Sequence, residues 1–119
     1  MKRKIFFNIL LIFLIFSIFI YANQKNKETA LNEQYLAALK LIGQEKYDEA
    51  LEALKEIIKR DLTFSKAYRK IVWIYIYENK LDSAKDFFEK LIQENKANPG
   101  AYYGLGLYYK EKEEFNQAV

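Results

Sequence analysis

One interval organises this chain, and it is clearest in residues 65–98, which read SKAYRKIVWIYIYENKLDSAKDFFEKLIQENKAN. Ala84 in this stretch has counterparts at Ala50 and Ala118, one equal interval before it and one after it. Two further sets of residues keep this repeat interval, one large and apolar and one suited to capping a helix: Tyr47, Leu81 and Phe115, and Asp48, Asp82 and Asn116. Because landmarks at one fixed spacing are the sequence signature of a repeat protein, we expect three copies of one structural unit.

The repeated unit has the pattern of helices. In residues 48–61 the apolar side chains recur at helical spacing and Glu and Lys lie opposite, which is typical of a half-buried helix and not of a catalytic carboxylate pair. Pro99 predicts another helix start, because proline is pre-set for the first helical position. We expect an all-α fold with helices near 31–44, 48–61, 65–79, 82–95 and 99–113, and a sixth from Asn116. Asp48, Asp82 and Asn116 are the expected N-caps.

Residues 31–119 resemble the tetratricopeptide repeat family, whose unit is a helix–turn–helix of about 34 residues. The middle copy carries the family's positions as Tyr68, Ile71, Val72, Tyr75, Leu81, Ala84, Phe88 and Leu91. The third copy carries them as Tyr102, Leu105, Gly106, Tyr109, Phe115 and Ala118, and the first as Gln34, Ala37, Ala38, Leu41, Tyr47, Ala50, Leu54 and Ile57. The resemblance implies repeats at 31–64, 65–98 and 99–119, the last incomplete, stacked as a right-handed α-solenoid. It also implies that Gly106 stands where two helices pack closely.

The N-terminus has the pattern of a targeting segment. Three basic residues, at positions 2 to 4, precede an apolar run from Ile5 to Tyr21, and polar residues begin at Asn23. The pattern predicts that residues 1–22 are a signal peptide with Ala22 as the last residue removed, or an uncleaved transmembrane anchor that contacts the membrane through residues 5–21.

Residues 23–30, which read NQKNKETA, are expected to be a short polar tether. A basic start keeps the N-terminus of such a chain in the cytoplasm while the remainder crosses the membrane. We therefore expect the repeat domain to be exported across, or anchored in, the cytoplasmic membrane and to lie on its non-cytoplasmic side.

The composition excludes most catalytic chemistry. The chain has no cysteine and no histidine, which removes thiol nucleophiles, imidazole bases and the common zinc sites. The formal charge of +3 comes from the three basic residues of the N-terminus, because the other 16 basic residues face 16 acidic ones. We expect no enzymatic activity, no cofactor, no metal and no binding of nucleic acid.

One face of the helix at 65–79 is the candidate for partner binding. Its core stripe is expected to run through Tyr68, Ile71, Val72 and Tyr75, and a second stripe carries cations and aromatics. In proteins that this sequence resembles, such stripes line the concave surface. The candidate groove residues are Tyr35, Leu39, Lys66, Arg69, Trp73, Tyr77, Tyr103, Leu107 and Lys110. Two readings of Trp73 stay open: an exposed interface anchor beside a cation, or a buried side chain of a repeat flanked on both sides.

These features predict a non-catalytic module of the cell envelope that binds a protein or peptide on its concave face. The alternatives are a structural tether that self-assembles or joins a larger envelope complex without its own ligand, and a non-catalytic segment of a larger enzyme. The third copy reaches only Val119, so we expect Tyr102, Leu105, Tyr109 and Phe115 to lack part of their cover. We therefore expect a truncated segment of a longer repeat protein, or self-association or a partner at this C-terminal edge.

Overall fold

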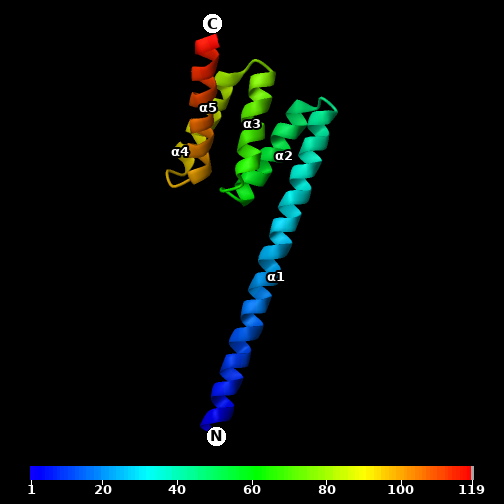
Figure 1. Cartoon of the computed structure of the whole chain (residues 1–119), viewed down its shortest axis with the longest axis vertical. Helices are drawn as coiled ribbons and strands as arrows, with labels where there is room; N and C mark the ends of the chain where they lie inside the picture. The colour runs from blue at the N-terminus through cyan, green and yellow to red at the C-terminus, as the bar shows by residue number, and fades with distance from the viewer. Residues whose placement is uncertain (119) are drawn as a thin grey trace. The chain divides into compact units, whose positions relative to one another are not determined.

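The computed structural model describes residues 1–118, which are helical apart from short connections (Figure 1). The helices are α1 (Lys2–Gly43), α2 (Tyr47–Arg60), α3 (Ser65–Tyr77), α4 (Leu81–Glu94) and α5 (Pro99–Ala118). No strand occurs in residues 1–118, so the predicted all-α class is confirmed. The chain divides into two compact units, residues 1–33 and the residues from Gln34 onward. Val119, the last residue of the expected third repeat, lies outside the described residues.

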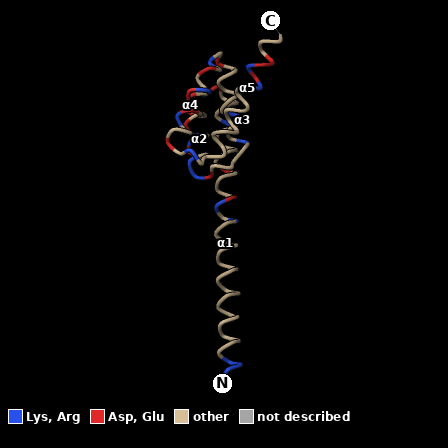
Figure 2. The backbone as a smooth tube through the Cα atoms, turned by 90° about the vertical axis from the view of Figure 1, so that its left-hand side faces the viewer, with Lys and Arg blue, Asp and Glu red and all other residues tan. Residues whose placement is uncertain are grey.

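The apolar part of α1 is exposed on all sides of the helix. The large hydrophobic residues from Ile5 to Tyr21 are between 42% and 70% exposed, and no charged residue interrupts them, as the tan stretch above the basic N-terminus in Figure 2 shows. Among the described residues, α1 is the one helix long and apolar enough to cross a membrane, and the apolar stretch of an N-terminal signal sequence meets the same criteria.

The expected start of the first helix at Leu31 is wrong, because α1 already contains residues 23–30. This segment has no glycine or proline to break a helix, and its Lys, Glu, Gln and Ala residues favour one. The hydroxyl of Thr29 donates a hydrogen bond of 2.9 Å to the carbonyl of Lys25 one turn earlier. A helical linker of this length rises only about 1.5 Å per residue, instead of the 3.3–3.6 Å expected for an extended tether.

The core of the second unit lies around α3, which contacts α2, α4 and α5 (Figure 1). Its largest fully buried side chains are Tyr68, Phe88, Leu54, Ile57, Ile71 and Ile74. The Tyr68 ring lies 6.1 Å from that of Phe88 and 6.3 Å from that of Tyr103 between ring centroids. Tyr68, Ile71 and Val72 are buried as expected, and Tyr75 is half-buried. Burial of these rings and branched side chains is the main term that stabilises the unit.

The connections after α2 and α4 have the same local structure at equivalent positions of the repeat interval. The Asp61 carboxylate accepts a hydrogen bond of 2.9 Å from the N–H of Thr63, and the Asn95 side-chain oxygen accepts one of 3.0 Å from the N–H of Ala97. Both arrangements are Asx turns, which lead the chain out of one helix toward the next.

Tyrosine hydroxyls hold these two connections in place, again at equivalent positions. Tyr68 donates a hydrogen bond of 3.1 Å to the carbonyl of Leu62, and Tyr102 donates one of 3.1 Å to the carbonyl of Lys96. The turns that precede α2 and α4 also match, because Glu45 and Asn79 have positive φ angles of 60° and 59°. The local structure of the first expected copy therefore recurs once, in the second copy, at the interval seen in the sequence.

The predicted N-caps are wrong. Helices α2 and α4 begin one residue earlier, at Tyr47 and Leu81, and the residues before them make no side-chain cap hydrogen bond. Asp48 and Asp82 are therefore inside the first turn, where their charge still complements the positive end of the helix dipole. The structure has a side-chain cap at α5 instead, where the buried Asn98 oxygen accepts a hydrogen bond of 3.1 Å from the N–H of Ala101.

The predicted start of α5 at Pro99 is confirmed, but its predicted end is wrong. The helix continues to Ala118 and contains Asn116, which was expected to cap a sixth helix. Residues 110–118 read KEKEEFNQA, in which Lys, Glu and Gln favour helix and neither glycine nor proline occurs. Nothing in the local sequence therefore ends α5 at the predicted turn.

Candidate functional site

The candidate site is a cluster of aromatic side chains around Trp73, on α3 and at the start of α2. Trp73 and Tyr77 stack with ring centroids 5.3 Å apart and planes at 15°. The Tyr47 ring lies 5.0 Å from that of Tyr77 and 6.4 Å from that of Trp73. The ammonium of Lys70 lies 5.5 Å from the centroid of the Trp73 ring, which is within the range of a cation–π interaction. These four residues, Tyr47, Lys70, Trp73 and Tyr77, are called the Trp73 cluster below.

The helix geometry brings the cluster together. Trp73 and Tyr77 are four residues apart on α3, so their side chains lie on one face, and Lys70 is one turn before Trp73. Tyr47 joins them as the first residue of α2, because α2 packs against α3. A hydrogen bond with Tyr77 raises the pKa of Tyr47 to about 12, with burial adding to the effect. Tyr47 is therefore a neutral phenol at physiological pH.

The Trp73 cluster is open to solvent at its centre. Trp73 is 39% exposed and Tyr77 is 59% exposed, so the reading of Trp73 as a buried core residue is wrong. Of the two readings of Trp73, the buried one fails because the side chains that cover α3 lie over its other face, where Tyr68, Ile71 and Ile74 are buried. A large aromatic side chain that is partly desolvated by neighbouring rings is typical of an anchor at a protein interface.

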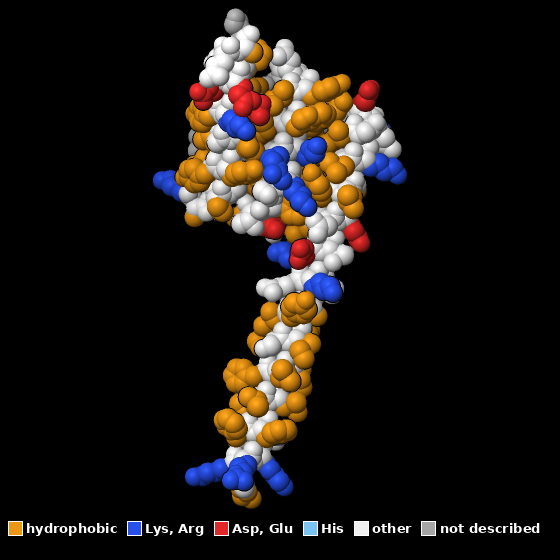
Figure 3. All heavy atoms as spheres, viewed as in Figure 1, with side chains coloured by type: hydrophobic (Ala, Val, Ile, Leu, Met, Phe, Trp, Pro, Cys, Tyr) orange, Lys and Arg blue, Asp and Glu red, His pale blue; other side chains and the backbone are white. Residues whose placement is uncertain are grey.

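Helix α3 and the first half of α5 carry no negative charge, although Glu45 and Glu78 act electrostatically on Tyr47 at the edge of the cluster. Helix α3 carries Lys66, Arg69 and Lys70 and no acidic residue, and α5 carries no charge before Lys110. Figure 3 shows basic side chains gathered in the middle of the folded unit, between patches of hydrophobic atoms. Burial raises the pKa of Tyr35, and the positive charge of Arg69 opposes that rise. Arg69 is therefore near enough to Tyr35 to act on its hydroxyl electrostatically.

The structure brings together only part of the predicted groove. Trp73 and Tyr77 are in contact, and Tyr103 packs edge-on against Tyr68. The other predicted residues divide by exposure into Lys66, Arg69 and Lys110, which are exposed, and Tyr35, Leu39 and Leu107, which are half-buried. Within residues 1–118 no ring contact joins Tyr35 or Tyr103 to Trp73, since Tyr35 instead pairs with Phe64 at 5.6 Å.

Sequence reasoning missed Tyr47 as a member of the site. Its position in the repeat interval predicted a packing role, and its neighbours on α2 gave no sign of an aromatic near the surface. The sequence did contain a sign of this position: Tyr47 directly follows a polar turn, and an aromatic residue at the first position of a helix lies near the protein surface. Only the packing of α2 on α3 shows which aromatics it meets.

A second group of polar residues links α4 to α5. The Asp82 carboxylate accepts a hydrogen bond of 2.8 Å from the Tyr108 hydroxyl and one of 3.2 Å from the Lys112 ammonium. A hollow of about 380 Å³ lies beside it, lined by Ile76, Asn79, Lys80, Leu81, Asp82, Ser83, Lys112 and Phe115. Because the carboxylate already has two donors, this group is a structural link and not a poised acid or base.

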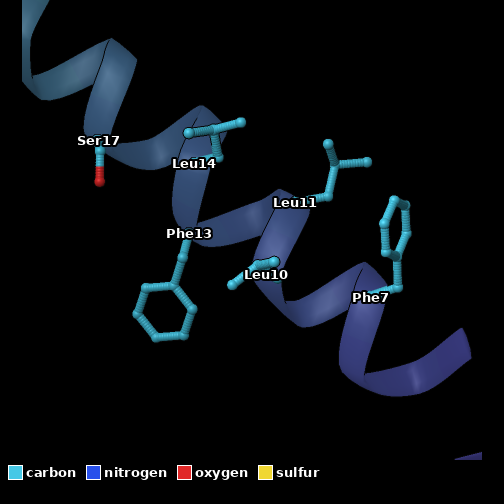
Figure 4. Close-up of a pocket in the computed structure, with 6 residues that line it drawn as sticks. All are labelled: Phe7, Leu10, Leu11, Phe13, Leu14 and Ser17. Carbon is cyan, nitrogen blue, oxygen red and sulfur yellow. The ribbon is translucent and has the colours of Figure 1, made fainter. Parts of the chain in front are cut away.

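Neither the hollow on α1 nor the acidic side chains of residues 1–118 form an enclosed site or a metal site. The apolar hollow in Figure 4 is formed by side chains of α1 alone, between Phe7 and Ser17, and it is the open surface of one helix. Across residues 1–118, no three acidic, histidine or cysteine side chains are placed to hold a metal ion. The Trp73 cluster therefore remains the candidate site.

No protein-family model, no curated protein and no solved structure matches this chain.

Proposed function

We propose that this chain is a non-catalytic protein-binding repeat module of the cell envelope, which holds a peptide or partner protein on the face that carries the Trp73 cluster. The observation that carries the proposal is an exposed tryptophan, stacked on Tyr77 and covered by the Lys70 ammonium. Tryptophan, tyrosine and arginine are the residues that most often dominate the binding energy of protein interfaces. Arg69 is exposed on the same helix.

The proposed architecture is a right-handed α-solenoid of the tetratricopeptide type. It is supported by local structure that recurs at the repeat interval: the two Asx turns at Asp61 and Asn95, and the two tyrosine hydrogen bonds from Tyr68 and Tyr102. In such an array each unit buries its apolar face against the next, so the faces that remain open are available to partners.

The proposed location of the repeats is the non-cytoplasmic side of the cytoplasmic membrane. It is supported by the basic residues Lys2, Arg3 and Lys4 before the exposed apolar part of α1. Within residues 1–118 no other part of the chain covers this apolar stretch. The hydrocarbon core of a membrane, or the export machinery during passage, would provide apolar surroundings for it. Cleavage after Ala22 and retention as an anchor are both consistent with this location.

The binding role is tested by affinity capture from envelope membranes with the full chain and two variants. Trp73→Ala removes the centre of the cluster, whereas Ile76→Ala removes an exposed apolar side chain of similar exposure, 40%, that makes no ring contact with it. We expect a specific partner to be lost with Trp73→Ala and kept with Ile76→Ala. Equal capture by the two variants, with equal helical circular dichroism, would contradict the proposal.

A structural tether without its own ligand is the second candidate. It is favoured by the exposed aromatic side chains of α5, because Tyr102 and Tyr109 are 51% and 52% exposed. A tether self-assembles or joins a larger complex through such a surface and has no need of Trp73. Loss of assembly on changing α5, with no effect of Trp73→Ala on any partner, would favour this candidate over the first.

A further inference from the structure

Helix α5 has an apolar surface that the folded unit does not cover. Residues 99–109 carry no charge, and the helix buries only one side, at Gly100, Ala101, Gly104 and Tyr108. On the opposite side Tyr102 and Tyr109 are about half exposed, and Leu105 between them is half-buried. A helix that is apolar all round is normally covered on all sides, so this outer face has the character of a contact surface.

Gly106 stands in the middle of this outer face without a reason inside the chain. A side chain built at Gly106 would meet no atom within 4 Å, whereas one built at Gly104 would overlap the Phe88 ring and one at Gly100 would overlap Tyr68. No glycine of residues 1–118 has a positive φ, so the backbone at Gly106 does not require glycine either. Because glycine weakens a helix relative to alanine, its presence here favours the close approach of another helix.

We propose that α5 packs antiparallel against α5 of a second copy of this chain, with the two helices crossing at Gly106. In this arrangement the same face serves both copies: Tyr102 of each lies beside Tyr109 of the other, and the two glycines allow the backbones to approach. A two-fold contact of this kind is isologous, so it closes as a dimer and does not extend into a filament.

The charges along α5 favour the antiparallel direction. No like charges meet at the centre, because residues 99–109 are uncharged. At the ends, the exposed Glu113 and Glu114 of one copy lie near the start of α5 in the other, where the helix dipole is positive and Lys96 is exposed. A parallel pair would place these acidic residues side by side. The second copy is therefore complementary in charge.

This contact goes beyond the proposed binding role and does not depend on it, because no residue of the Trp73 cluster is on α5. Disulfide trapping tests it directly, since the chain has no cysteine. Each variant of the full chain has one introduced cysteine and is studied in detergent micelles. We expect Gly106→Cys to form covalent dimers at least about ten times faster than the control Glu56→Cys, which changes an exposed residue of α2.

The direction of packing has its own test. Tyr102→Cys and Tyr109→Cys chains with different tags are mixed, and we expect the mixed disulfide to exceed either homodimer. Trapping at Ser17→Cys without trapping at Gly106→Cys would show that the copies associate through the apolar part of α1, and it would overturn the proposal. Homodimers of Tyr102→Cys in excess of the mixed product would overturn the antiparallel arrangement.

A charged substitution completes the test without any cross-link. Gly106→Glu is compared with Gly43→Glu, because a side chain at either glycine meets no atom of the folded chain within 4 Å. Sedimentation in density-matched detergent is expected to show a dimer dissociation constant raised at least about tenfold by Gly106→Glu and unchanged by Gly43→Glu. A wild-type chain that stays monomeric at micromolar concentration, or equal effects of the two substitutions at equal helical content, would refute the contact.

Discussion

The hydroxyl of Tyr108 donates a hydrogen bond of 2.8 Å to the carboxylate of Asp82, a residue far from it in the sequence. The bond joins the first turn of α4 to the middle of α5, and Lys112 adds a second donor at 3.2 Å. Asp82 was expected to cap its own helix, but its side chain reaches α5 instead. The contact adds a polar link to the packing of α5 on α4.

This link predicts a loss of stability in acid. The hydrogen bond from Tyr108, followed by the Lys112 interaction, lowers the pKa of Asp82. Because the pKa is lower in the folded state, the stabilisation is complete above the ordinary carboxyl pKa of about 3.9 and is lost as pH falls through the folded value. Melting temperatures followed by circular dichroism should fall less steeply below about pH 4.5 in Asp82→Asn than in the wild type.

The control for this prediction is Asp48→Asn, at the equivalent position of α2, because both aspartates lie in the first turn of their helices and Asp82 alone of the two is bonded to α5. Any flattening by Asp82→Asn beyond that of Asp48→Asn is therefore due to the link to α5, and equal effects of the two substitutions would contradict the prediction.

Tyr108 should govern the loss of stability in alkali, because its hydrogen bond to Asp82 raises its pKa to about 12. Its contribution is complete below its ordinary pKa of about 10 and is lost as pH rises toward 12, so Tyr108→Phe should flatten that limb.

Truncation of Trp73 should separate binding from stability. Phe88 is completely buried, so Phe88→Ala should lower the free energy of unfolding by about 3–5 kcal/mol. Trp73 is 39% exposed, so Trp73→Ala should cost clearly less than that in chemical denaturation. If the cluster anchors a partner, the same substitution should weaken capture by about 2 kcal/mol or more, roughly thirtyfold. A cost equal to that of Phe88→Ala would show that Trp73 is a core residue.

The two glycines of α5 should respond to alanine in opposite directions. A methyl group at Gly104 would overlap the Phe88 ring, so Gly104→Ala should destabilise the fold by about 1–3 kcal/mol. A methyl group at Gly106 meets open space within the chain, so Gly106→Ala should stabilise it by about 0.5–1 kcal/mol. Denaturation at concentrations too low for a second copy to bind gives the comparison. Destabilisation by both would show that α5 packs more closely than the structure has it.

The location of the proposed repeats should be visible with a C-terminal reporter that fluoresces only in the cytoplasm. The basic residues at positions 2 to 4 followed by the apolar run of α1 predict that this fusion stays dark. Replacing Leu11 and Leu14 with lysine interrupts the run and should leave the fusion bright. Mass spectrometry of the N-terminus then distinguishes Asn23 from Met1 as the first residue of the mature chain. Fluorescence of the wild-type fusion in the cytosol would rule out export.

Local signals determined most of the secondary structure. The apolar run after the basic N-terminus, the helical spacing in 48–61 and the proline at position 99 each predicted an element that the structure contains. The errors also had local causes: residues 23–30 and 110–118 contain good helix formers and no breaker, so α1 and α5 continue where turns were expected. The repeat interval was visible in the sequence because the same turns recur at it.

Tertiary structure decided which face of each helix is covered, and periodicity cannot supply that information. In α5 apolar residues occupy every side, so no pattern distinguishes the side that buries Tyr108 from the side that exposes Tyr109. The resemblance placed close packing at Gly106, but it is Gly104 that lies against Phe88. Likewise Trp73 is exposed, and Tyr47 joins it, because of how α2 crosses α3. Which face of a helix is buried depends on which helices pack against it, and only the tertiary structure fixes those neighbours.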